Sequence, residues 1–184
     1  PPISTLFPYT TLFRSIKSFL VSDDANITLS EYESFSEKSS LDIKIRDISF
    51  ITSVKGASGA KFINGQKTAI YLVKDTLFAL NASTGEAKRV GVTKKHEISD
   101  ESPFIGWYKG KLLFYTDITA ERADSLSNVA GVSFTPAGDM VVLSSDSNQR
   151  LLIRINSQAK NRFKRDTLFI TDKYLSEISV GKNG

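Results

Sequence analysis

Residues 61–90 decide the fold: they read KFINGQKTAIYLVKDTLFALNASTGEAKRV. Short apolar runs recur in this stretch, at 61–63, 69–73 and 77–80. Pairs of residues typical of turns separate them, at 64–65, 74–75 and 84–85. A spacing of about ten residues suits one short strand and one tight turn, because Gly and Asn tolerate the positive φ of hairpin turns. The stretch therefore predicts a meander of antiparallel strands.

A second series of turns follows further along the chain, near residues 138, 148 and 158. It is offset from the first by 73 residues, which is close to twice the ~40 residues of a four-stranded propeller blade. The segment around Trp107 and Gly110 would form the blade between them. We therefore predict an all-β fold of antiparallel four-stranded meanders, an incomplete β-propeller of about three to four blades. A β-sandwich is the alternative.

The alternating pattern begins at Leu41. Leu41, Ile43 and Ile45 alternate with polar residues, as in a half-buried strand, and the pattern resumes at Ile48 and Phe50 as after a bulge. Residues 16–40 are instead polar and rich in Ser, Asp and Glu. We predict a polar linker or irregular segment over 16–40 and a propeller-like fragment over 41–184.

The first fifteen residues have a different origin. Thr5–Ser15, TLFPYTTLFRS, is identical to one reading frame of the common Illumina sequencing adapter. We therefore expect residues 1–15 to be an adapter-derived artefact and exclude them from fold reasoning. The chain is then expected to be a metagenomic or transcript fragment of a longer protein, with its true N-terminus and any signal peptide missing.

Composition excludes several classes of function. The net charge of +4, to which Arg14 contributes one, is far below that of a dedicated nucleic-acid binder. The absence of cysteine excludes disulfides and thiolate metal sites. The longest apolar runs, such as Ala69–Val73, fall far short of the ~20 residues of a membrane span.

Two segments carry a family resemblance. Tyr71–Val90, with LFALNA followed by TGE at Thr84–Glu86, resembles the repeat of pyrroloquinoline-quinone-type propellers. Asn81 stands where these repeats usually have Asp, and Lys88 and Arg89 replace the usual Trp. Val132–Ile155 is similar to a generic propeller unit through Phe134, Pro136, Gly138 and Asp139. The resemblance implies a propeller and favours an exported or periplasmic protein, and the style of the repeat also resembles that of scaffolds of the bacterial outer-membrane assembly type.

The candidate interaction residues are aromatic and basic. Trp107 and Tyr108 could form a ligand platform, although strand alternation places them on opposite faces of a sheet. Arg162, Lys164 and Arg165 flank Phe163 in a basic cluster that could contact a partner. We predict these five residues as a possible interaction surface.

Catalytic, cofactor and metal residues are not predicted. His96 is the one histidine and has no identifiable catalytic partner in the sequence. Acidic residues cluster without the ligand spacing of a calcium loop, at Asp100, Glu101, Asp117, Glu121 and Asp124. We expect a solvated rim here and no cofactor.

The sequence favours a non-catalytic propeller module that binds a protein or another macromolecular partner. Nucleic acid is not favoured as that partner. One alternative is a fragment of a propeller enzyme whose active-site residues lie in missing blades. Another is a structural protein of a phage or cell surface.

Overall fold

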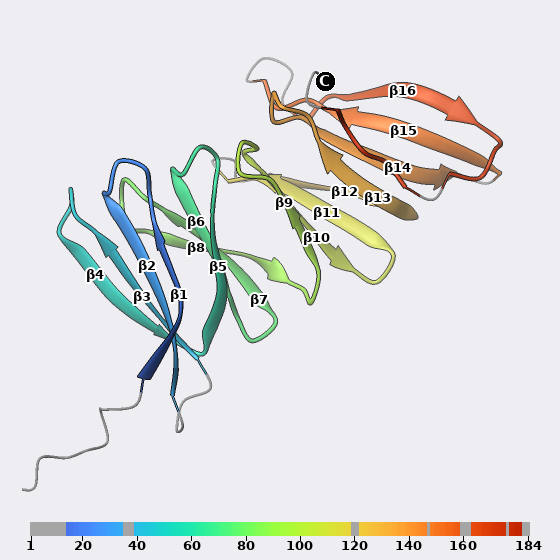
Figure 1. Ribbon diagram of the computed structural model, residues 1–184. Coiled ribbons are helices and arrows are strands. Elements are labelled where there is room, and N and C mark those ends of the chain that lie inside the picture. The colour runs from blue at the N-terminus through green and yellow to red at the C-terminus, as the bar shows by residue number, and fades with distance from the viewer. Residues whose placement is uncertain are drawn as a thin grey trace, which may run out of the picture.

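The computed structural model describes residues 14–34, 39–118, 122–146, 148–158, 163–175 and 177–181. Within these ranges the chain forms sixteen strands and no helix (Figure 1). The strands make four sheets of four strands each, and every sheet is an antiparallel meander of consecutive strands. The predicted all-β propeller architecture is confirmed, with four blades.

The blades follow one another along the chain. The first contains β1 (Arg14–Val21), β2 (Ile27–Ser34), β3 (Ser40–Ile45) and β4 (Phe50–Lys55). The second contains β5 (Ala57–Ile63), β6 (Thr68–Val73), β7 (Thr76–Asn81) and β8 (Ala87–Val92). The third contains β9 (His96–Ile98), β10 (Phe104–Lys109), β11 (Leu112–Asp117) and β12 (Ala123–Ser127). The fourth contains β13 (Val129–Phe134), β14 (Met140–Asp146), β15 (Gln149–Ile155) and β16 (Arg165–Thr171).

The turn residues of the second blade act as the sequence predicts. Asn64 and Gly65 both have positive φ, 55° and 57°, in the four-residue loop that joins β5 to β6. Lys74 also has positive φ, and Gly85 adopts it in the Thr-Gly turn before β8. These turns fix the register in which Ile70 pairs with Ala79 and Lys61.

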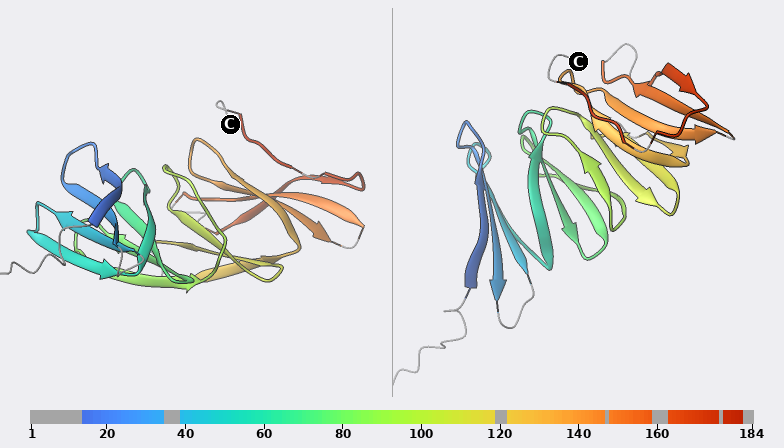
Figure 2. Two further views of the ribbon diagram at one scale, coloured as in Figure 1. Left: turned by 60° about the horizontal axis from the view of Figure 1, so that its bottom comes forward. Right: turned by 45° about the vertical axis from the view of Figure 1, so that its right-hand side comes forward.

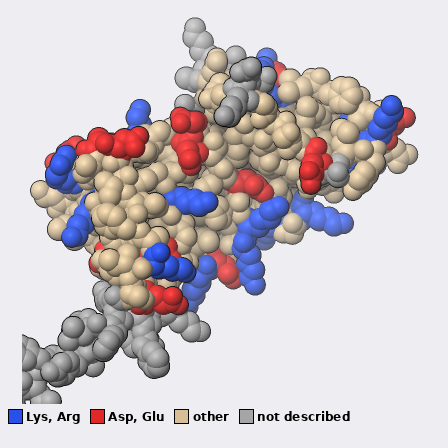
Figure 3. All heavy atoms as spheres, viewed as in Figure 1, with Lys and Arg blue, Asp and Glu red and all other residues tan. Residues whose placement is uncertain are grey.

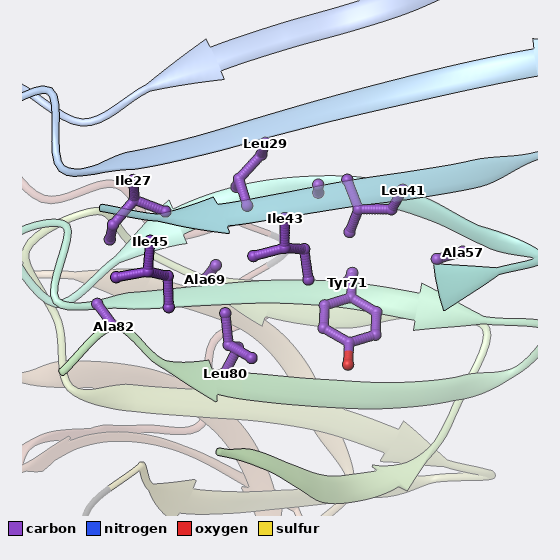
Figure 4. Close-up of a cluster of buried hydrophobic side chains, with 11 residues drawn as sticks. Ile27, Leu29, Leu41, Ile43, Ile45, Ala57, Ala69, Tyr71, Leu80 and Ala82 are labelled. Atoms are coloured by element: carbon purple, nitrogen blue, oxygen red, sulfur yellow. The ribbon is translucent and has the colours of Figure 1, made fainter. Parts of the chain in front are cut away.

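Three apolar clusters hold neighbouring blades together. The first lies between the first and second blades (Figure 4): Ile27, Leu29, Leu41, Ile43, Ile45, Ala57, Ala60, Ala69, Tyr71, Leu80 and Ala82. The second joins the second and third blades: Ile63, Ile70, Leu77, Ala79 and Ile105. The third joins the third and fourth blades: Phe104, Leu113, Tyr115, Met140, Val142 and Ile155. Each blade thus buries its apolar face against a neighbour, as propeller blades do.

The four blades form an open arc. Figure 2 shows them side by side in both views, with the first and fourth at opposite ends of the arc. Beyond β16 the chain turns back along the fourth blade, and Ile178 lies beside Gly131 of β13. Arg150 of β15 stacks on the ring of Tyr174 in the same segment. Tyr174 and Ile178 therefore pack against the fourth blade.

The antiparallel order places the loops on two rims. We define the upper rim, at the top of Figure 1, by the loops at 22–26, 46–49, 64–67, 82–86, 99–103 and 135–139. The lower rim is the set of loops at 74–75, 93–95, 110–111 and 128. Every second loop along the chain thus reaches the same rim.

The structure corrects two expectations. Residues 16–40 contain most of β1 and all of β2, where we expected a linker. Polar composition concealed these strands, because Glu31 is buried among them and is satisfied by Lys17 and by the Gly59 N–H. The expected bulge before Phe50 is a full turn at 46–49, with Ser49 at positive φ.

Residues 1–13 lie outside the described part of the chain, and the remaining adapter-like residues, Arg14 and Ser15, begin β1.

Candidate functional site

A groove of about 860 Å³ opens on the upper rim, where the loops of the first three blades converge. The first blade contributes residues 22–24, Asn26 and Asp47, and the second contributes residues 65–67 and Ser83. The third blade contributes Asp100 and Glu101. Concave surfaces that several elements build together are the usual place for ligands and partner segments.

Hydrogen bonds donated by main-chain N–H groups hold these loops in place. The Gly65 N–H donates to the carbonyl oxygen of Asp100 at 2.9 Å, which links the second and third blades. The Asp23 N–H donates to Oε1 of Gln66 at 2.6 Å, which links the first and second. Asn26 accepts from the Asp47 N–H through its side chain at 2.8 Å. The groove is therefore formed before any partner arrives.

The groove is acidic. Five carboxylates line it, from Asp23, Asp24, Asp47, Asp100 and Glu101, against the two ammonium groups of Lys61 and Lys67. The Ser22 hydroxyl and the Asn26 N–H donate to Asp24 and hold its pKa below the usual value. Figure 3 shows acidic side chains gathered along the upper left edge of the molecule. The arrangement suits a cationic ligand.

The predicted aromatic platform is not exposed as a pair. Trp107 is only 8% exposed and stacks on Phe114, with ring centroids 5.7 Å apart. Tyr108 faces the other way and is half-buried, with the Lys95 ammonium 4.6 Å from its ring centre. Burial, with a smaller contribution from Glu97, raises the pKa of Tyr108 to about 12. Trp107 is thus a core residue, and the two side chains do not form a ligand platform together.

The described residues of the predicted basic cluster make different contacts. Arg165 donates to the Tyr115 hydroxyl at 2.9 Å and to the Ser125 carbonyl at 3.0 Å, and it pairs with Asp124 at 2.9 Å. It therefore joins the third and fourth blades. Lys164 is exposed and pairs with Asp166 at 3.4 Å, while Arg162 lies outside the described residues. Lys164 and Tyr108 stay predicted contact residues.

The acidic residues of the 100–124 window have separate roles. Asp100 and Glu101 line the groove, Asp117 is buried, and Asp124 pairs with Arg165. Glu121 lies outside the described residues. In the described ranges no three His, Asp or Glu side chains are grouped to hold a metal ion.

The surroundings of His96 disfavour its protonated form. It lies in β9 opposite Trp107, and burial lowers its pKa below 6.5, aided by the charge of Lys61. Because the folded state disfavours the imidazolium, the folded protein loses stability as the pH falls from 6.5 toward the lower pKa of His96 in the fold. We expect NMR titration of this single histidine to give a pKa below 6.5, and Lys61→Gln to move it upward. A pKa above 6.5 in the folded protein would contradict this assignment.

Sequence reasoning missed the groove. Its carboxylates come from three loops that are spread between Asp23 and Glu101, and each loop alone is an ordinary polar turn. The available signal was the order of the loops, because every second turn of a meander reaches the same rim. Asp23, Asp47 and Asp100 all lie in such turns.

The open arc and this rim define the class of protein: a partial β-propeller with one acidic face. No protein-family model matches the chain, and no curated protein matches it. Among solved structures, a eukaryotic initiation factor is similar to it with a TM-score of 0.53 and 8% identity, over 85% of this chain and 43% of that one.

An uncharacterized protein from Listeria monocytogenes EGD-e is similar with a TM-score of 0.51 and 12% identity. The match covers 86% of this chain and 52% of that one. The chain thus spans about half the length of the solved structures that it matches. At these identities the likeness shows the fold, which is the β-propeller.

Among the described residues, no helix is long and apolar enough to cross a membrane.

Proposed function

We propose that this chain is a non-catalytic propeller module that binds a protein partner by holding a basic, extended segment of it in the upper-rim groove. The observation that carries the proposal is the acidic groove at the meeting point of three blades. One main-chain hydrogen bond and one from main chain to side chain link its loops across the blades, so little ordering cost remains on binding.

The charges of the groove determine the kind of partner. Asp47, Asp100 and Glu101 lie on two loops of the rim, 46–49 and 99–103, where a Lys- or Arg-rich segment can contact several carboxylates in turn. Such exposed pairs contribute about 0.2–1 kcal/mol each and weaken with salt. Binding should therefore be moderate and salt-dependent.

The test is fluorescence anisotropy with a labelled octalysine peptide at low ionic strength. We expect the triple variant Asp47→Asn, Asp100→Asn, Glu101→Gln to raise the Kd by roughly tenfold, from about 0.5 kcal/mol for each of the three lost pairs. These three side chains are chosen because Asp24 has a structural role within its loop.

The matched control removes the same charge elsewhere. Asp75→Asn, Asp172→Asn, Glu177→Gln neutralises three exposed carboxylates away from the groove. If both triple variants weaken octalysine binding equally, net charge and not the groove accounts for the binding, and the proposal fails.

Two more specific assignments are also proposals: a relationship to quinoprotein-type repeats and a non-native origin of the first fifteen residues. The Thr84-Gly85-Glu86 turn before β8 supports a relationship to quinoprotein-type repeats, which carries the expectation of an exported scaffold with it. The identity of Thr5–Ser15 with adapter translation supports a non-native origin for residues 1–15. Amplifying the gene from source DNA tests the second point: codons for TLFPYTTLFRS upstream of Ile16 in the genome would refute it.

A further inference from the structure

The lower rim has the opposite charge. The loops of the second and third blades on this rim carry Lys74, Lys94, Lys95, Lys109 and Lys111, all exposed. Asp75 is the one exposed carboxylate in the same loops, and Glu97 pairs with Lys95 at 3.3 Å. Figure 3 shows a concentration of basic side chains along the lower edge of the middle of the molecule.

Hydrogen bonds join these loops into one surface. The Thr93 N–H donates to the Asp75 carbonyl at 2.7 Å, and the Tyr108 N–H donates to the Lys95 carbonyl at 3.1 Å. The Asn128 N–H donates to the Lys111 carbonyl at 3.2 Å. The lysines therefore stand on loops that are fixed relative to one another across two blades.

Aliphatic side chains are exposed beside the lysines. Val92, the last residue of β8, is 51% exposed, and Leu112, the first residue of β11, is 39% exposed. Val92 precedes Lys94, and Leu112 lies opposite Lys109 in the β10–β11 hairpin. Each blade thus presents an aliphatic group next to ammonium groups on the same rim.

We propose that the lower rim docks on the surface of an anionic lipid bilayer. The lysines would be attracted by anionic headgroups, at about 1 kcal/mol for each lysine near the surface. Val92 and Leu112 would enter the boundary between headgroups and acyl chains, where apolar side chains gain from leaving water. The upper-rim groove then faces away from the membrane and stays open to a protein partner.

The same lysines could attract a nucleic acid, but the rest of the surface does not suit one. In the described loops of this rim on the second and third blades, there is no Arg for a bidentate phosphate contact. Stacking of bases needs exposed aromatic faces, whereas Trp107 is buried and Lys95 lies over Tyr108. Exposed Val92 and Leu112 gain more from a bilayer than from a phosphate backbone.

The experiment is co-sedimentation of the full chain with vesicles of phosphatidylcholine, with and without ~30% phosphatidylserine, an anionic lipid. We expect binding only to the anionic vesicles. The variant Lys94→Gln, Lys109→Gln, Lys111→Gln should lower the partition coefficient by roughly tenfold or more. The control Lys44→Gln, Arg46→Gln, Lys88→Gln removes the same charge from exposed positions outside both the lower rim and the groove and should retain binding.

A second arm separates a membrane from a polyanion. Val92→Ser, Leu112→Ser keeps every charge and should weaken vesicle binding several-fold, with no effect on binding of a DNA duplex. An equal loss of vesicle binding in the Lys94/Lys109/Lys111 variant and in its charge-matched control would overturn the proposal. So would duplex binding that exceeds vesicle binding at the same salt, or vesicle binding unchanged in the Val92/Leu112 variant. Groove variants of the upper rim should bind vesicles normally, so the two proposals fail independently.

Discussion

Leu41→Ala is expected to lower the free energy of unfolding by about 3 kcal/mol, within the 2–5 kcal/mol typical of buried Leu→Ala changes. Leu41 is fully buried in β3, and its side chain points from the first blade toward Tyr71 of the second (Figure 4). The change removes three carbons from the cluster that joins these blades. Since β-strands on either side fix the backbone, the space can close only in part.

Urea denaturation followed by circular dichroism measures this loss. Ile51→Ala is the matched control, because Ile51 lies in the adjacent strand of the same blade and is 73% exposed. It should change stability by less than about 0.5 kcal/mol. Similar losses in both variants would mean that the first and second blades do not share the core described here.

The second large effect is expected at Gly91. This residue of β8 lies against the indole of Trp107 in the third blade, and a Cβ at position 91 would stand 2.4 Å from Nε1 of the ring. The indole cannot easily retreat, because it is stacked on Phe114 and is almost fully buried. Gly91→Ala should therefore separate the second and third blades and destabilise the fold by about 1–3 kcal/mol.

Trp107 is the only tryptophan, so its fluorescence reports the change directly. We expect a red shift of the emission in Gly91→Ala as water reaches the ring. A double-mutant cycle with Trp107→Leu isolates the contact, because Gly91→Ala should cost much less once the indole is gone. Additive losses in that cycle would place the strain elsewhere.

The strands of the second and fourth blades could be predicted from sequence because their information is local. Turn pairs such as Asn64-Gly65 and runs such as Ala69–Val73 specify hairpins within about ten residues. The first two strands could not, because Glu31 and Ser30 are polar residues that become buried. Glu31 is satisfied by Lys17 and Gly59, and Gly59 belongs to another blade.

For the candidate site residues too, local features could be predicted from the sequence and long-range contacts could not. The sequence correctly separated Trp107 and Tyr108 onto two faces of a strand, but alternation alone could not say which face is core. Arg165 looked like a member of a basic surface, and its contact with Tyr115 is made 50 residues away. Long-range pairing of this kind leaves no local pattern.

The sequence by itself determined most of the strands and turns beyond residue 41 and their spacing, and hence a propeller of short meanders. The tertiary structure alone decided which faces are buried and how the charges are distributed. An antiparallel meander sends alternate loops to opposite rims, so Asp47 and Asp100 meet on one rim while Lys94 and Lys111 meet on the other. Charges that are mixed along the chain are thereby separated in space, because rim position depends on the order of the loops and not on the residues around each charge.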